Sequence, residues 1–202
     1  MKNWKSKIIG GVLRASAFVV LLILAGIILY VLVLGIPQIK PSLFQWKYNS
    51  ENVSMMPAII NTILMIILSL AIAIPLGLGA AIFLTQYKKE GVVVKVIRMT
   101  SETLSGIPSI VYGLFGNIFF STFCGLGYSL LSGALTMAIM ILPLIMRTSE
   151  EAFLALSKGL EESSLALGAG KLRTISKVLL PSAMSGIISG IILGMGRVLG
   201  ES

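Results

Sequence analysis

The sequence predicts an all-α membrane protein, a polytopic helical bundle with five transmembrane helices. Of its 202 residues, 56% are hydrophobic and only 12% are charged, whereas soluble domains contain about 25% charged residues. The charges gather in short clusters separated by long uncharged runs. A membrane helix needs about 20 apolar residues, and each run reaches that length. Composition and charge spacing therefore both indicate a chain that crosses a membrane several times.

The first two helices are expected near residues 13–35 and 57–84. A basic N-terminus precedes an uncharged run over residues 15–39, which is too long for the core of a signal peptide. We expect a retained helix with the N-terminus in the cytoplasm, because basic flanks stay on that side. The second helix contains Pro75, which a bilayer helix tolerates when its neighbours satisfy the freed backbone groups.

Residues 103–146 form one uncharged run. This length has room for two spans, which we expect near residues 104–121 and 127–146. Basic clusters at 88–102 and 147–177 flank the pair and are predicted to face the cytoplasm.

The fifth helix, expected at 182–200, combines small residues with two opposite charges. The small residues recur every four positions, share one helix face and permit close approach of a partner helix; they are Ser182, Gly186, Gly190 and Gly194. Arg197 and Glu201 continue this face. An arginine near a helix end can snorkel to lipid headgroups. Opposite charges on the small-residue face favour instead a polar substrate pathway.

Several chemistries are excluded by the composition. The chain has no histidine and no aspartate, which removes a Ser-His-Asp triad and most zinc sites, so we expect no catalytic residue and no metal site. Gly168 to Lys171 looks like the end of a phosphate-binding loop, but Leu172 stands where a magnesium-binding Ser or Thr belongs. The basic residues form no single patch that would suit nucleic acid. The lone Cys124 has no partner in the chain for a disulfide.

The polar segment at 161–181 resembles the signature of the ABC importer permease family. That signature reads E-A-A, three residues, G, nine residues, I-x-L-P. Here it is Glu162-Ser163-Ser164, then Leu165 to Leu167, Gly168, nine residues, and Val178-Leu179-Leu180-Pro181. Residues 106–116 (GIPSIVYGLFG) and 142–152 (LPLIMRTSEEA) are similar to the phosphate branch of the family. The resemblance covers about residues 60–202.

The resemblance implies a domain organisation and a set of partners. Residues 1–56 would be an anchor helix with an outer loop, and 57–202 a permease domain whose cytoplasmic coupling loop is about 148–181. Such importers are ATP-driven and sit in the bacterial plasma membrane. Two different permease subunits form the pathway for inorganic phosphate, and an extracytoplasmic binding protein delivers it. A cytoplasmic ATPase dimer uses ATP and Mg, so this chain would be a transporter subunit that binds no cofactor and is no enzyme.

The resemblance also assigns roles to residues. The side chains expected to couple to the ATPase are Glu162, Ser163, Ser164, Leu165, Leu167, Gly168 and Pro181. The family's Arg-x-x-Gly-Glu pattern falls on Arg197, Gly200 and Glu201, where the guanidinium would bind phosphate and Glu201 would pair with it in the empty site. Family members continue into a sixth helix, so we expect an end at Ser202 to reflect truncation.

Other functions remain open on the sequence. The chain is compatible with an importer for another oxyanion, or with an ion-coupled secondary transporter that works without an ATPase. A membrane-embedded enzyme and a purely structural subunit are weaker alternatives. Co-purification of an ATPase distinguishes an importer, of phosphate or of another oxyanion, from the secondary transporter, the enzyme and the structural subunit.

Overall fold

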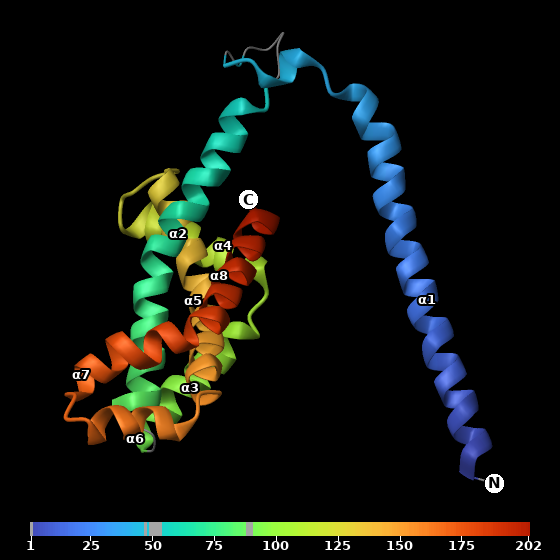
Figure 1. Cartoon of the computed structure of the whole chain (residues 1–202). Coiled ribbons are helices and arrows are strands. Elements are labelled where there is room, and N and C mark those ends of the chain that lie inside the picture. The colour runs from blue at the N-terminus through green and yellow to red at the C-terminus, as the bar shows by residue number, and fades with distance from the viewer. Residues whose placement is uncertain (1, 47, 49–53, 88–90) are drawn as a thin grey trace. The chain divides into compact units, whose positions relative to one another are not determined.

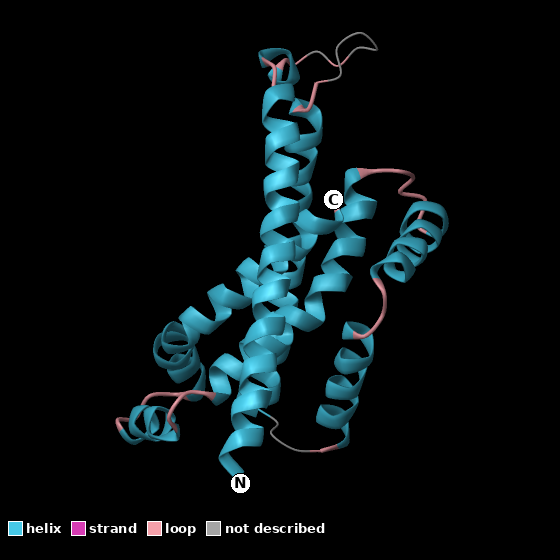
Figure 2. Ribbon diagram, turned by 90° about the vertical axis from the view of Figure 1, so that its right-hand side faces the viewer, coloured by secondary structure: helices cyan, strands magenta, loops and turns pink. Residues whose placement is uncertain are grey.

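Helices form every regular element that the structure describes. A computed structural model describes residues 2–46, 48, 54–87 and 91–202 (Figures 1 and 2). Four helices in these ranges are long and apolar enough to span a membrane, and a fifth span results if one bent pair is counted as a single span. The expected fold class is therefore confirmed. Residues 88–90, which belong to the basic cluster at 88–102, lie outside the described ranges.

The chain divides into two compact units, Met1–Pro57 and Ala58–Ser202. The first unit holds α1 (Lys2–Gly35), which contains the helix expected at 13–35. Two short 3-10 helices follow, Ile36–Gln38 and Pro41–Phe44. The side chains of α1 from residue 8 onward are almost all exposed within the chain, as suits a helix whose apolar surface faces lipid or other subunits.

The second unit carries the remaining helices. In chain order they are α2 (Met56–Ile82), the π-helical segment Phe83–Tyr87, α3 (Val92–Ser105), α4 (Ser109–Gly116), the π-helical segment Asn117–Phe123, α5 (Leu130–Leu154), α6 (Lys158–Ala166), α7 (Lys171–Thr174), the π-helical segment Ile175–Leu179 and α8 (Leu180–Glu201). In Figure 1, α6 and α7 lie at one end of this unit and the C-terminal end of α8 points away from them.

The second unit is built around the contact between α5 and α8. Gly186 and Gly190 face α5 so closely that an added Cβ atom would overlap Ala152 and Thr148, respectively. Gly194 faces Ile145 of α5 and Leu70 of α2. Ser182 does not take part: it is exposed, and its hydroxyl donates to the carbonyl of Val178 in the preceding π-helical segment. Three of the four small residues therefore lie at the seam between the two helices.

The prediction of a helix at 104–121 is wrong about where the helix starts. Residues 104 and 105 belong to α3, and α4 begins only at Ser109, with an angle of 101° between the two helical pieces. Pro108 explains the break, because its ring restricts the preceding residue to extended backbone and it has no N–H for a continuing helix. Uncharged composition alone gives no sign of this bend.

Two helices extend beyond the expected ends. The helix expected at 127–146 runs instead from Leu130 to Leu154, because charged residues after Met146 are neutralised and do not end it. The helix expected at 182–200 belongs to one span that begins at Lys171. Pro181 therefore lies inside a helical run, where the preceding π-helical turn accommodates a residue that has no N–H to donate.

An ion pair anchors α3 to the extended end of α5. Arg98 donates from Nε to Oε1 of Glu150 at 2.9 Å and from Nη2 to the same oxygen at 2.5 Å. Glu150 is only 8% exposed. A second pair, from Arg147 to Glu151, connects exposed side chains one turn apart on α5.

Replacing Gly190 by alanine should destabilise the second unit by about 1–3 kcal/mol, because the new methyl group overpacks the seam against Thr148. The matched control is Gly196→Ala on the same helix, whose Cβ meets no atom within 4 Å. That change should be neutral or stabilise by up to about 1 kcal/mol through helix propensity. Both effects are measured as changes in the free energy of unfolding in detergent. Equal changes for the two substitutions would contradict the close packing of Gly190 against Thr148.

The Arg98→Ala substitution should lower the free energy of unfolding by about 1–3 kcal/mol, because it leaves the buried carboxylate of Glu150 without its partner. Arg147→Ala removes the exposed pair and should cost under about 0.5 kcal/mol. The same unfolding measurement compares the two arginines. A larger loss for Arg147→Ala would show that burial of the acid does not set the strength of the pair.

Candidate functional site

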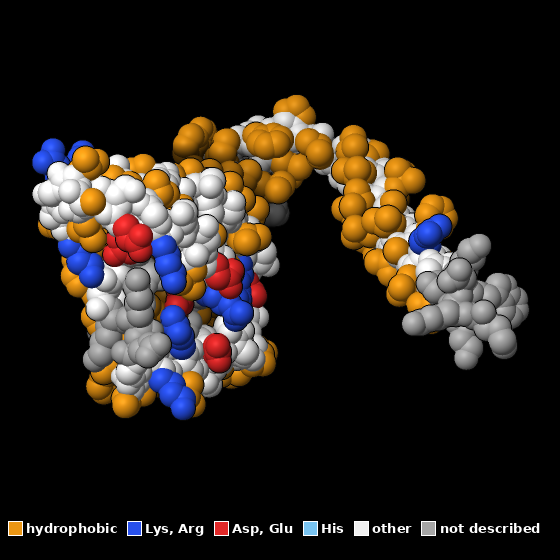
Figure 3. All heavy atoms as spheres, turned by 60° about the horizontal axis from the view of Figure 1, so that its bottom comes forward, with side chains coloured by type: hydrophobic (Ala, Val, Ile, Leu, Met, Phe, Trp, Pro, Cys, Tyr) orange, Lys and Arg blue, Asp and Glu red, His pale blue; other side chains and the backbone are white. Residues whose placement is uncertain are grey.

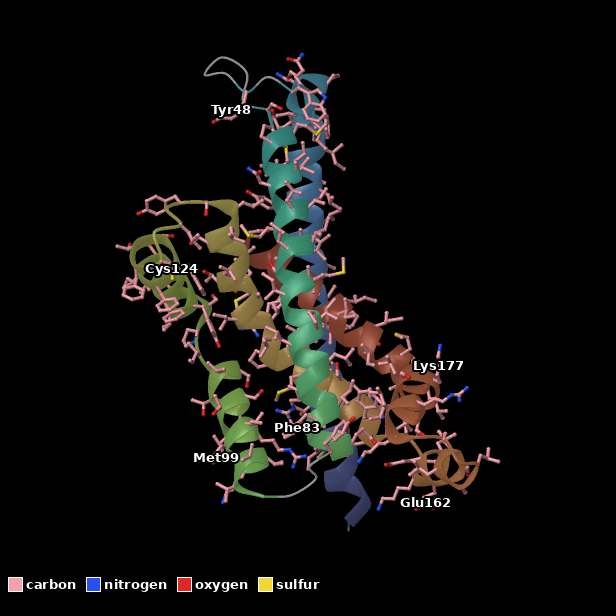
Figure 4. The ribbon with its side chains drawn as sticks, turned by 90° about the vertical axis from the view of Figure 1, so that its left-hand side faces the viewer. Tyr48, Phe83, Met99, Cys124, Glu162 and Lys177 are labelled. Atoms are coloured by element: carbon pink, nitrogen blue, oxygen red, sulfur yellow. The ribbon has the colours of Figure 1, made fainter. Side chains whose placement is uncertain are left out.

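The segment that carries the family signature forms a helix, a tight turn and a second helix. α6 ends at Ala166, and a new helical run begins at Lys171. The turn lies at the end of the second unit, where lysine, arginine and glutamate side chains gather (Figure 3). Figure 4 shows Glu162 on α6 at this end, well separated from Cys124 on the opposite side of the unit.

Gly168 closes the turn through a Schellman motif. Its N–H donates to the carbonyl of Leu165 at 3.0 Å, and the N–H of Ala169 donates to the carbonyl of Ser164 at 3.2 Å. Gly168 has a φ of +84°, a left-handed conformation that glycine adopts without the steric cost of a Cβ. The glycine of the signature is therefore explained by backbone geometry.

Two side-chain contacts hold the turn in place. The hydroxyls of Ser164 and Thr174 are hydrogen-bonded at 2.9 Å, which connects α6 to α7. Thr174 is almost fully buried. The Nζ atom of Lys171 lies 4.9 Å from the ring centre of Tyr87, a cation–π contact that connects the turn to the π-helical segment Phe83–Tyr87. The turn is thus attached both to the helical run of α8 and to the segment that follows α2.

The outer surface of α6 offers both charge and apolar side chains. Glu162, Ser163 and Leu165 are exposed, and Leu167 is 89% exposed. Exposed leucines beside a carboxylate form a surface that suits a protein partner better than water. Pro181 is not part of α6, because it is the second residue of α8.

The structure places Arg197 and Glu201 differently from each other. Arg197 is half-buried on α8. Glu201 is exposed and lines a cavity of about 430 Å³ between α4, α5 and the end of α8. Within the described ranges the two side chains form no salt bridge with each other.

Two contacts of this segment escaped the sequence analysis. They are the hydrogen bond of Thr174 with Ser164 and the contact of Tyr87 with Lys171. Neither had a signal in the sequence, because single threonine and tyrosine residues near a membrane helix end are common.

The chain is similar to known membrane transport proteins. Residues 73–202 match the family described as the binding-protein-dependent transport system inner membrane component. The chain is 34% identical over 198 residues to the probable ABC transporter permease protein YqgI of Bacillus subtilis, which covers 97% of this chain and 67% of that protein. It is 34% identical over 186 residues to the phosphate transport system permease protein PstA homolog of Mycoplasma pneumoniae, covering 88% of this chain and 28% of that protein.

Two further comparisons found similar proteins, one by sequence and one by structure. The chain is 36% identical over 145 residues to the phosphate transport system permease protein PstA 1 of Mycobacterium tuberculosis, covering 72% of this chain and 47% of that protein. A solved structure, titled a crystal structure of an amino acid ABC transporter with histidines, has a TM-score of 0.52 at 19% identity. It covers 71% of this chain and 65% of that chain. This second likeness concerns the fold alone.

Fold and similarity together define a multi-pass membrane protein of the transporter permease class. The chain belongs to the family of binding-protein-dependent transport system inner membrane components, that is, the ABC transporter permeases. It spans 28–67% of the length of the three relatives named above. Membership of this family favours an ABC permease subunit over the ion-coupled transporter, the enzyme and the structural subunit.

The Gly168→Ala variant should destabilise the turn by about 1–2 kcal/mol, because alanine in a left-handed conformation is strained. Gly170→Ala is the control, since Gly170 has a φ of −67° and open space around it. Hydrogen exchange of the Gly168 and Ala169 amides should become about tenfold faster in the first variant, given that 1.4 kcal/mol is a tenfold change. Equal exchange in both variants would contradict the motif.

Proposed function

We propose that this chain is a permease subunit of an ATP-driven importer of inorganic phosphate. A second, different permease subunit would complete the pathway, an extracytoplasmic binding protein would deliver the anion, and a cytoplasmic ATPase dimer would hydrolyse ATP with Mg. The names of two relatives support phosphate as the substrate, since both are phosphate transport system permeases. The basic flanks support a cytoplasmic N-terminus and a cytoplasmic α6 in the bacterial plasma membrane.

The observation that carries the choice of an anion is the position of Arg197. It lies half-buried on the last helix, and no carboxylate in the described ranges forms a salt bridge with it. A guanidinium inside a membrane span needs an anion or water around it. Its planar donors match the oxygens of phosphate, which they bind bidentately.

A broken helix adds support for the same region. α4 starts at Ser109, directly after the break, with no side-chain cap on its first N–H groups. Ser109, Tyr112 and Glu201 line one cavity. Transporters often use the ends of broken helices to contact ions near the middle of the membrane. Glu201 at the same cavity would repel the anion and so favour its release.

We further propose that α6 is the coupling helix. Leu165 and Leu167 would enter a groove of the ATPase and Glu162 would meet a basic partner, while Gly168 keeps the turn tight. The fixed connection from Ser164 to Thr174 supports this role, because a displacement of α6 is then passed on to the helical run of α8.

The Arg197→Ala variant should lose phosphate uptake by at least about a hundredfold, because a charge-assisted bidentate contact contributes about 3 kcal/mol. Membrane vesicles with both permeases, the ATPase and the binding protein measure ATP-dependent uptake of labelled phosphate. Co-purification of the ATPase with the variant is the control for assembly. Uptake at the normal rate by an assembled Arg197→Ala complex would refute the assignment.

The same vesicles distinguish phosphate from another oxyanion. Unlabelled phosphate should compete with labelled phosphate, whereas sulfate and molybdate in equal excess should leave uptake unchanged. ATP-dependent uptake of sulfate or molybdate in place of phosphate would keep the importer and replace its substrate.

A further inference from the structure

The segment between α1 and α2 exposes its large aromatic side chains instead of packing them (Figure 1). It holds the two short 3-10 helices Ile36–Gln38 and Pro41–Phe44, and neither of them contains a buried residue. Phe44 is 51% exposed, Trp46 is 76% exposed and Tyr48 is 63% exposed. Aromatic rings in water are unfavourable, so three exposed rings close together indicate a surface that an apolar partner covers.

The length of α1 places this segment at a boundary of the membrane. The first span is Ile8–Gln38, and Arg14 is the last charge before its uncharged run. From Arg14 to Gly35, where α1 ends, the helix advances about 32 Å at 1.5 Å per residue. The hydrocarbon core of a bilayer is roughly 30 Å thick. The residues after Gly35 therefore begin where the hydrocarbon ends.

The length of the second span leads to the same position from the other side of the segment. This span runs from Met56 to Tyr87 over 32 residues, which is about 48 Å of helix. A bilayer with its headgroups is about 40–45 Å thick. Both ends of this span therefore reach the headgroup layer, and Met56 directly follows the segment.

The backbone of the segment excludes the hydrocarbon core as its location. The Ser54 hydroxyl donates to the carbonyls of Leu43 and Gln45, and the N–H of Met55 donates to the carbonyl of Leu43 at 2.8 Å. These bonds close the segment, but its backbone is otherwise irregular outside the two short helices. Irregular backbone that faces lipid does not occur in the hydrocarbon region, because its polar groups would have no partners there.

We infer that Phe44, Trp46 and Tyr48 anchor the chain in the headgroup layer of the bilayer, at the boundary where α1 ends. The rings need apolar surroundings and the irregular backbone needs polar partners, and the headgroup layer supplies both. Tryptophan and tyrosine suit this layer because each joins an apolar ring to a polar N–H or O–H group. Lys40, exposed in the same segment, places its ammonium among the lipid phosphates.

The anchor fixes how deeply α1 lies in the membrane. The uncharged run at 15–39 is about 37 Å long as a helix and exceeds the hydrocarbon core, so α1 can tilt unless anchors hold its two ends. The inference requires only that α1 and α2 span a membrane, and only its assignment to the outer leaflet rests on the proposed function. It does not depend on the transported anion, so a failure of phosphate uptake and a failure of the anchor are distinguishable.

The test uses the fluorescence of Trp46, one of two tryptophans in the chain. The full chain with Trp4→Phe is reconstituted in phosphatidylcholine vesicles whose lipids are brominated either near the headgroup or near the ends of the acyl chains. Shallow bromine should quench Trp46 about twofold more than deep bromine, because indole rings lie at headgroup level. Iodide on both sides of the membrane should quench it weakly. Equal or stronger quenching by deep bromine would overturn the inference.

A matched control calibrates depth on the same helix. Leu24→Trp in a chain that also carries Trp4→Phe and Trp46→Phe places the single ring near the middle of the uncharged run. Deep bromine should quench this ring more than shallow bromine does, which is the reverse of the order expected for Trp46.

Two further outcomes would also overturn the inference. Strong quenching by iodide, with none by either brominated lipid, would place Trp46 in water. Protection from iodide only after an extracytoplasmic binding protein is added would show that a protein covers the rings instead of the bilayer. If Trp4→Phe does not fold, the difference in emission between the wild-type chain and Trp46→Phe gives the same readout with Trp4 in place.

Discussion

The close contact between α5 and α8 fixes the position of everything else in the second unit. In a bilayer the helices gain little from leaving lipid, so tight packing of small residues has to hold them together. Gly186 and Gly190 permit that approach. Thr148, which faces Gly190, turns its hydroxyl to the carbonyl of Leu144 in its own helix at 2.9 Å. The seam is therefore close and leaves no polar group of Thr148 unsatisfied.

The same two helices connect to the polar features at both ends of the unit. α5 is followed closely by α6, and α8 continues the helical run that starts with α7 and includes Thr174. The path from Thr174 to Arg197 is one helical run, about 35 Å long at 1.5 Å per residue. Because the Ser164 hydroxyl is hydrogen-bonded to Thr174, the turn after α6 is connected to the helical run that carries Arg197. With this connection, a displacement of α6 would be passed along one continuous helical run.

The sequence predicted what depends on local pattern and missed what depends on distant contacts. Uncharged runs indicated the spans, and signature spacing located the turn at Gly168. The break at Pro108 was missed because hydropathy stays high through it, although Gly106 and Pro108 were a readable signal. The true end of α5 was missed because its charges suggested a loop, and only Arg98, 52 residues away, shows why Glu150 remains helical and buried. The cavity at Glu201 was beyond prediction, because separate segments of the chain form it.

Three arginines of the second unit differ in how their charge is balanced, and this difference supports Arg197 as the proposed anion-binding residue. Arg98 is neutralised by Glu150 and Arg147 by Glu151, so neither has charge to spare for a ligand. Arg197 has no such partner in the described part of the chain, although Glu201 stands only one turn away. A half-buried charge that remains unpaired inside a span is costly unless water or an anion reaches it. Arg98 and Arg147 are paired whereas Arg197, near the far end of its span, is not, and in the proposed function the transported anion balances that charge.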